Sequence, residues 1–380
     1  MLNTNYRQLY AVGVVALTMI MTAGLAQAQV PAEIEAQLVK IGHIVDPACT
    51  AKIYRPLMPA NDVNSTVTPV YPGITVARDV SFGPNPKDVV DIFTADKGGK
   101  NRPVLMYIPG GAGNKIEQQD REANAFYDNI MRWATKNGMV GVNMQRHPGS
   151  DWDSGGKDVS LMIQWVEANI SKYKGNPDRM FIWAQSAGNG PLGVYIGRAE
   201  LYGPKGVGVK GAIFMSGQFN ILPVTPAAAA PAPGGRGPVD ILAGAGTTCG
   251  LPAGAAFSNA GAIAGPSRAD DPPARGGGGG GFGRGPQIDP ATQLARSSLP
   301  ELKKTKVKIM LATAELDPGI NGTDSAFNKA LHDELCKEGP DHCPTMLFEK
   351  GESHMSEVFS IDTPDKVVSG PILKWIKSIK

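Results

Sequence analysis

From residue 74 onward the chain alternates short apolar runs with longer segments in which apolar residues recur every three or four positions. Short apolar runs are typical of buried strands, and the longer spacing indicates helices with one buried face. Strands are expected at 74–83, 89–95, 102–111, 139–145, 179–185, 209–217, 306–317 and 345–351, the first two as an antiparallel pair. Helices are expected at 121–138, 157–173, 187–201, 323–337 and 364–380. Apolar strands that alternate with helices predict the α/β class, with a mostly parallel central sheet and helices on both faces.

Two segments do not follow this alternation. Residues 29–70 form a proline-rich lead-in, and residues 223–298 consist largely of alanine, proline and glycine, with six glycines in a row at 276–281. The second composition buries too little apolar surface to offset the entropy lost on ordering. We therefore expect a long, largely disordered insertion within a single domain at 29–380. The alternative is a linker between two domains, but the strands that follow are too few to form a second one.

Residues 1–28 have the features of a secretory signal peptide. Arg7 precedes the apolar run AVGVVALTMIMTAGLA, and Ala26-Gln27-Ala28 form an A-x-A cleavage site. The alternative is a retained membrane anchor, because the apolar run is nearly long enough to span a bilayer. The small-residue site favours cleavage, so we expect a secreted or periplasmic protein with no stable membrane anchor afterwards.

Charge and cysteine content narrow the picture further. The 37 basic and 35 acidic residues leave a net charge of +2, which gives no reason to expect a nucleic-acid partner. Four cysteines fit an oxidising compartment. Cys336 and Cys343 lie seven residues apart around a Gly-Pro turn, which favours a local disulfide and leaves Cys49 to pair with Cys249. Four cysteines allow three connectivities, so the pairing stays open at this point, and nothing in the sequence indicates an oligomeric state.

Chemically active side chains stand at the carboxyl ends of three expected strands. These residues are Ser186, Asp317 and His354, in that order along the chain. Open α/β sheets bind their ligands at the edge where parallel strands end, so the three side chains are expected to meet there. A hydroxyl, an imidazole and a carboxylate together can form a catalytic triad, in which the histidine activates the serine and the acid orients the histidine.

These segments, in this order, resemble the α/β-hydrolase fold, in particular its carboxylesterase and hormone-sensitive-lipase-like branch. VLMYIPGGAG is similar to that branch's strand and oxyanion loop, FIWAQSAGN to its nucleophile elbow, and LATAELDP and GESHMS to its acid and histidine segments. The resemblance covers about residues 72–222 and 299–380. It implies a serine hydrolase that cleaves a small-molecule carboxylic ester through an acyl-enzyme, without a cofactor or metal. The backbone N–H groups of Gly111, Ala112 and Ala187 are then expected to form the oxyanion hole.

Two positions depart from the family pattern, and two site residues have rivals. Ala184 replaces the first glycine of G-x-S-x-G, which adds one methyl group to a tight turn, and Pro109 stands where the oxyanion loop has histidine. The second change is expected to alter how the loop is braced. Glu315 is a rival acid, because it would face the same way as Asp317 along one strand. His147 also follows a strand, but it precedes the serine, which is the wrong order for this family.

The triad leaves the reaction class partly open. An amidase or peptidase could use the same three residues, and a catalytically inactive binding protein on this fold is a further alternative. The inactive alternative is disfavoured because all three triad members are present. No amphipathic lid helix is evident, which favours short-chain or aromatic esters over long-chain lipids.

Overall fold

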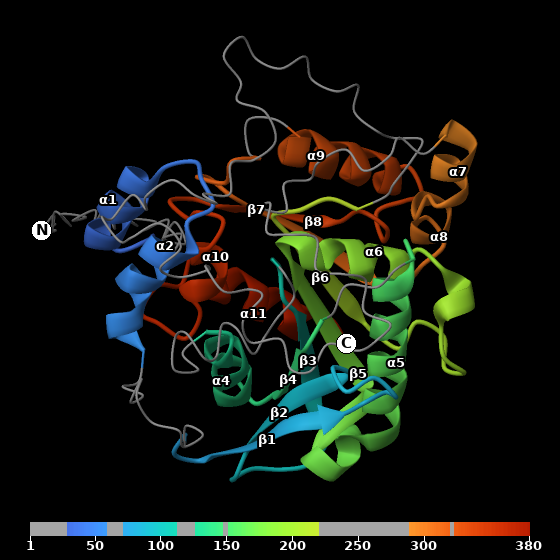
Figure 1. Ribbon diagram of the computed structural model, residues 1–380, viewed down its shortest axis with the longest axis horizontal. Helices are drawn as coiled ribbons and strands as arrows, with labels where there is room; N and C mark the ends of the chain where they lie inside the picture. Colours follow the sequence, from blue (N-terminus) through green and yellow to red (C-terminus); the bar gives the residue numbers. More distant parts are fainter. Residues whose placement is uncertain (1–28, 59–70, 112–125, 147–150, 220–288, 320–322) are drawn as a thin grey trace, which may run out of the picture.

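The computed structural model describes residues 29–58, 71–111, 126–146, 151–219, 289–319 and 323–380. Its centre is one eight-stranded sheet with the order β1-β2-β4-β3-β5-β6-β7-β8 (Figure 1). The strands are β1 Ile74–Ser81, β2 Val89–Ala95, β3 Arg102–Ile108, β4 Val140–Met144, β5 Gly175–Gln185, β6 Gly211–Met215, β7 Lys308–Ala314 and β8 Thr345–Glu349. β2 pairs antiparallel with β1 and with β4, and every other pair of neighbours is parallel. The predicted opening pair and the mostly parallel sheet are confirmed.

Helices cover both faces of this sheet (Figure 1). They are α1 Ala32–Ile41, α2 Pro47–Tyr54, α4 Asp128–Lys136, α5 Ser154–Asn169, α6 Asn189–Ile196, α7 Pro290–Ala295, α8 Leu299–Leu302, α9 Thr323–Cys336, α10 Ser356–Phe359 and α11 Ser369–Ser378. Within β3, Leu105 and Tyr107 pack in a core cluster with α1, α4 and α11, whereas Val104 and Met106 pack in a second cluster with α5, α6 and α9. A strand buried on both faces needs an apolar residue at nearly every position, which explains the apolar runs in the sequence.

The proline-rich lead-in contains two helices that its composition did not predict. Pro47 is the first residue of α2, a position where the missing N–H has no intrahelical partner in any case. Asp46 caps this helix, since its side chain accepts a hydrogen bond from the Cys49 N–H at 3.0 Å. α1 buries Ile34 and Leu38 in the core cluster that also contains α4 and α11. Proline here marks the beginning of a helix and not an irregular segment.

The carboxyl-terminal end of the expected insertion at 223–298 belongs to the folded domain. Asp289 caps α7 by accepting a hydrogen bond from the Thr292 N–H at 2.9 Å. Ser298 is fully buried and donates to the carbonyl oxygen of Gly193 in α6 at 2.9 Å. The remainder of the expected insertion, 223–288, lies outside the described residues, as does the expected signal peptide at 1–28.

Three of the expected helices are shorter than predicted. In the described part of the segment expected at 121–138, the helix α4 spans only Asp128–Lys136. The segment 187–201 divides into a 3₁₀ turn at Ser186–Gly188, the helix α6, and a second 3₁₀ turn at Ala199–Leu201. The closing helix begins at Ser369 instead of residue 364, because the Asp365 side chain accepts from the Val367 N–H and forms a turn ahead of it.

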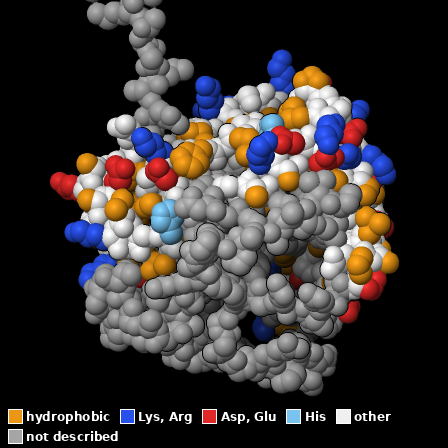
Figure 2. Space-filling model, turned by 90° about the horizontal axis from the view of Figure 1, so that it is seen from above, with side chains coloured by type: hydrophobic (Ala, Val, Ile, Leu, Met, Phe, Trp, Pro, Cys, Tyr) orange, Lys and Arg blue, Asp and Glu red, His pale blue; other side chains and the backbone are white. Residues whose placement is uncertain are grey.

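The structure contains the expected disulfide between Cys336 and Cys343, directly after α9. Cys49 is buried in the lead-in, but its proposed partner Cys249 lies outside the described residues, so that pairing stays a prediction. Within the described ranges, no helix combines the length and the apolar character needed to cross a bilayer. On the face seen from above in Figure 2, basic and acidic side chains are interspersed.

Candidate active site

Ser186 lies at a sharp turn between β5 and α6. Its φ is +53°, in the left-handed region that a non-glycine residue adopts only when the surrounding structure enforces it. A Cβ atom on Gly188 would lie 2.6 Å from the carbonyl oxygen of Ile108 and 2.9 Å from that of Pro109. A glycine is therefore required at position 188, two residues after the serine, because two backbone segments approach each other closely there. Ala184, which replaces the glycine of the family pattern, is accommodated as a fully buried residue of β5.

The structure brings the three predicted triad residues into one hydrogen-bonded line. His354 Nε2 lies 2.9 Å from Ser186 Oγ, and His354 Nδ1 lies 2.6 Å from Asp317 Oδ2. The other carboxylate oxygen of Asp317 accepts from the Gly319 N–H at 2.7 Å. Asp317 is 1% exposed and His354 is 7% exposed, so the line runs from the interior to a serine at the surface of the turn. This geometry suits proton transfer from the hydroxyl to the imidazole.

The electrostatics of Asp317 match its position. Burial by itself would raise the pKa of this carboxyl, but the charge of His354 and its hydrogen bond lower it, with smaller contributions from Gly319 and Ser216. The lowering effects prevail, and the pKa of Asp317 lies below its ordinary value. The carboxylate is therefore ionised at neutral pH and can stabilise a positive charge on the imidazole.

Of the two rival residues, the structure describes only Glu315, which does not join this line. β7 ends at Ala314, before both acids, so Glu315 and Asp317 are not on one face of a strand as expected. Glu315 instead accepts a hydrogen bond from the Gly351 N–H at 2.7 Å. His147 lies outside the described residues. A different histidine, His43 from the lead-in, contacts the main-chain oxygen of Asp317 at 3.4 Å, which no sequence signal indicated.

The expected oxyanion loop adjoins the serine. A Cβ atom on Gly110 would lie 2.8 Å from the Cβ of Ser186, so only glycine fits this approach. Gly111 has a φ of +55°, a conformation that glycine adopts without strain. Ala187 follows the serine directly and is half-buried. The third expected donor, Ala112, lies outside the described residues.

Arg146, which follows β4, braces this loop. Its Nε donates to the carbonyl oxygen of Pro109 at 3.3 Å, and its Nη2 donates to that of Gly111 at 2.5 Å. Burial lowers the pKa of Arg146, but a guanidinium keeps its proton at any working pH. The loop that has Pro109 in place of the family's histidine is thus held by an arginine that follows a neighbouring strand. Sequence analysis did not assign Arg146 a role, and its only signal was its place at a strand end.

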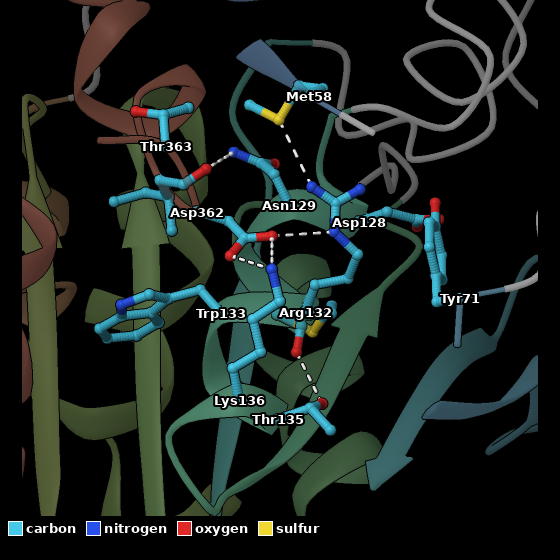
Figure 3. A network of polar contacts seen from close by, with 12 residues as sticks. Met58, Tyr71, Asp128, Asn129, Arg132, Trp133, Thr135, Lys136, Asp362 and Thr363 are labelled. Atoms are coloured by element: carbon cyan, nitrogen blue, oxygen red, sulfur yellow. Dashed lines mark hydrogen bonds and ion pairs between the residues drawn. The ribbon is translucent and has the colours of Figure 1, made fainter. Parts of the chain in front are cut away.

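The segment that carries His354 is fixed from the other side by α4 (Figure 3). Asn129 donates from Nδ2 to two main-chain carbonyl oxygens of α10 and the turn after it, at 2.8 and 3.0 Å. Arg132, 1% exposed, forms an ion pair with Asp362 at 2.9 Å, and Lys136 contacts the same carboxylate at 2.7 Å. These contacts attach α4 to α10, which begins two residues after His354, and to the turn that follows α10.

Four buried carboxyl groups lie close to the histidine segment. Glu349, Glu352 and Glu357 are fully buried, and Asp365 is 1% exposed. Burial raises the pKa of each of the four, and repulsion from neighbouring carboxyl groups adds to the rise at the three glutamates. In the part of the chain that the structure describes, no three metal-binding side chains are grouped so that they could share an ion.

Comparison with known proteins gives a family match over part of the chain. A family model described as BD-FAE matches residues 90–199, a segment that includes Ser186. Esterase LipQ from Mycobacterium tuberculosis is 30% identical over 115 residues, which are 29% of this chain and 26% of that protein. The probable carboxylic ester hydrolase LipM from the same organism is 36% identical over 89 residues, 23% of this chain and 19% of that protein. The matched segment spans about a quarter or less of these relatives.

Solved structures match over most of the chain. Carboxyl esterase 2 from Tuber melanosporum has a TM-score of 0.51 at 15% identity, covering 83% of this chain and 90% of that structure. A tributyrin-phosphonate-inhibited form of esterase B from Lactobacillus rhamnosis has a TM-score of 0.52 at 11% identity, covering 91% and 94%. At these identities the likeness concerns the fold.

Proposed function

We propose that the chain, which has the α/β-hydrolase fold and matches esterases over part of its length, hydrolyses carboxylic esters through an acyl-enzyme formed on Ser186. One observation carries the proposal: the line of hydrogen bonds from Ser186 Oγ through His354 to Asp317, at 2.9 and 2.6 Å. The fold supports many chemistries, whereas this line suits a serine that must lose its proton as it attacks.

In the first half of the reaction, His354 Nε2 takes the proton of Ser186 as Oγ attacks the ester carbonyl carbon. The tetrahedral intermediate then expels the alcohol, which leaves with the proton returned by His354. A water molecule repeats the sequence on the acyl-enzyme: it gives a proton to His354 as its oxygen adds to the carbonyl carbon. The second tetrahedral intermediate then breaks its bond to Ser186 Oγ, which takes the proton back from His354, and the acid is released. Asp317 holds the imidazole in the required tautomer and balances its charge.

The oxyanion of each intermediate needs donors that are already in place. We assign this role to the backbone N–H groups of Gly111, Ala112 and Ala187, of which the first and last lie on segments adjoining Ser186. Removing one such donor typically costs about 3 kcal/mol of transition-state stabilisation. Arg146 supports the loop by holding the carbonyl oxygens on its opposite side.

We place the enzyme outside the cytoplasm, in the periplasm or the medium. The signal-like composition of residues 1–28 supports this location, and so does the disulfide between Cys336 and Cys343, a bond that persists in oxidising compartments. Amino-terminal sequencing of the exported protein is expected to begin at Gln29. A first residue near Met1 would instead indicate that the apolar segment is retained.

The experiment that tests the activity compares the wild type with Ser186→Ala. The substrates are p-nitrophenyl esters of increasing chain length and a matched anilide, which separates esterase from amidase action. We expect turnover of the esters by the wild type, none by Ser186→Ala, and labelling of Ser186 by an organophosphonate. Ser171→Ala, an exposed serine on the same domain, is the control. Undiminished turnover by Ser186→Ala would refute the mechanism.

A further inference from the structure

Glu357 joins three parts of the site that are distant in the sequence. Its Oε1 accepts a hydrogen bond from Gln185 Nε2 at 2.9 Å, and its Oε2 accepts one from Ser216 Oγ at 2.6 Å. Gln185 is the last residue of β5, Ser216 directly follows β6, and Glu357 itself lies in α10. One fully buried carboxylate thus connects the ends of two neighbouring strands to the histidine segment.

Gln185 extends this connection to both members of the nucleophile–base pair. The residue precedes Ser186, and its Nε2 also donates to the main-chain oxygen of His354 at 3.0 Å. The amide nitrogen therefore uses one hydrogen on Glu357 and the other on His354. Loss of the Glu357 carboxyl would remove one of the two hydrogen bonds that Gln185 Nε2 donates and would leave this nitrogen with the bond to His354.

Backbone strain at both strand ends indicates why such a connection is needed. Ser186 has a φ of +53° and Ser216 a φ of +43°, and neither is a glycine. Non-glycine residues are strained in this region and persist there only where the surrounding structure holds them. Glu357 binds the side chain of Ser216 and the residue immediately before Ser186, so it acts on both strained positions.

We infer that Glu357 is a positioning residue for the hydrolytic reaction, acting through Gln185 and Ser216 to keep Ser186 and His354 within hydrogen-bonding distance. The inference rests on the proposed function, since it concerns the same serine and histidine. Packing alone gives no reason for the carboxylate, because burying this group without a basic partner is costly, whereas a leucine would fill similar space.

The chain offers a matched control in Glu349. It is also fully buried and interacts with Glu357 within the same group of carboxyls, but its oxygens accept no hydrogen bond from Gln185 or Ser216. Substitutions at Glu349 and Glu357 therefore perturb comparable buried volumes and charges. Only those at Glu357 remove contacts to Gln185 and Ser216.

The test measures kcat, KM and the melting temperature of Glu357→Leu, Glu357→Gln, Glu349→Leu and Glu349→Gln with a p-nitrophenyl ester. A misplacement of about 1 Å in a reacting pair can lower the rate about 100-fold. We expect Glu357→Leu to lower kcat by roughly 10- to 100-fold with little change in KM, Glu357→Gln to lower it less, and both Glu349 variants to retain wild-type kcat. If Glu357→Leu does not fold, the two glutamine variants provide the same comparison.

A double-mutant cycle identifies the route. Because Glu357 acts through Gln185, we expect the kcat of Gln185→Leu/Glu357→Leu to be no lower than that of the worse single variant. Wild-type kcat in Glu357→Gln and Glu357→Leu would overturn the inference, as would losses that follow melting temperature equally at Glu349 and Glu357. Such a result, with Ser186→Ala still inactive, would leave the proposed function standing.

Discussion

Glu349 provides a quantitative test of how the buried carboxyl groups affect stability. It is the last residue of β8 and is fully buried. Burial raises the pKa of Glu349 well above its ordinary value, and repulsion from Glu352 adds to the rise. The perturbation is Glu349→Gln, which keeps the shape of the side chain and removes its titration.

The sign of the effect follows from proton binding. Between the pKa of an unfolded glutamate, about 4.3, and the higher folded value, the folded state holds a proton that the unfolded state has lost. Stability is therefore greatest below about pH 4.3 and falls as the pH rises, by about 1.4 kcal/mol for each pH unit. Glu349→Gln has no proton to lose in this pH window, so the variant does not show this fall in stability.

The assay is thermal unfolding of the wild type and Glu349→Gln between pH 4 and pH 8. We expect similar melting temperatures near pH 4 and, as the pH rises above about 4.3, a gap in favour of the variant that widens by about 2 °C for each pH unit, for a domain of roughly 300 residues. Glu33→Gln, at an exposed position of α1, is the control and should show no such trend. A gap that does not change with pH, or a variant that is less stable at pH 8, would refute the reasoning.

Three further substitutions test the site and the fold. Asp317→Asn should lower kcat about 10⁴-fold because the amide favours the wrong histidine tautomer, whereas Glu315→Gln should remain near the wild-type rate; the reverse order in steady-state kinetics would move the acid by two residues. Arg146→Met removes both donors to the oxyanion loop and should lower kcat by up to about 100-fold, and an effect on KM alone would show that Arg146 binds substrate instead. Cys336→Ser with Cys343→Ser should lower the free energy of unfolding by about 2.5 kcal/mol in urea at constant kcat, and an unchanged midpoint would contradict this expectation.

The sheet and the triad positions were predictable because both depend on local pattern. A strand buried on both faces shows itself as an apolar run, and parallel strands end at one edge, so residues after successive runs are brought together without knowledge of the loops. The same reasoning did not predict α1 and α2, because it described the lead-in only by its proline content, although Pro47 occupies the first position of a helix.

The supporting residues could not be predicted in this way. Gln185 and Glu357 are 172 positions apart, and Arg146 binds carbonyl oxygens 37 and 35 positions away. Every residue has a backbone carbonyl, so the sequence does not indicate which carbonyl a distant side chain binds. A buried glutamate in α10 likewise has no periodicity that distinguishes it from an exposed one.

The separation of Ser186 from His354 has a consequence for biosynthesis. The two residues are 168 positions apart, and β7 and β8 must add to the sheet before the imidazole reaches the hydroxyl. At about 5–20 residues per second, the ribosome releases the serine roughly 10–30 s before the histidine. Throughout that interval the Ser186 hydroxyl of the nascent chain has no base beside it. It becomes a nucleophile only when the segment that carries His354 has been made and has folded onto the sheet. Premature termination anywhere before residue 354 yields a product without hydrolytic activity.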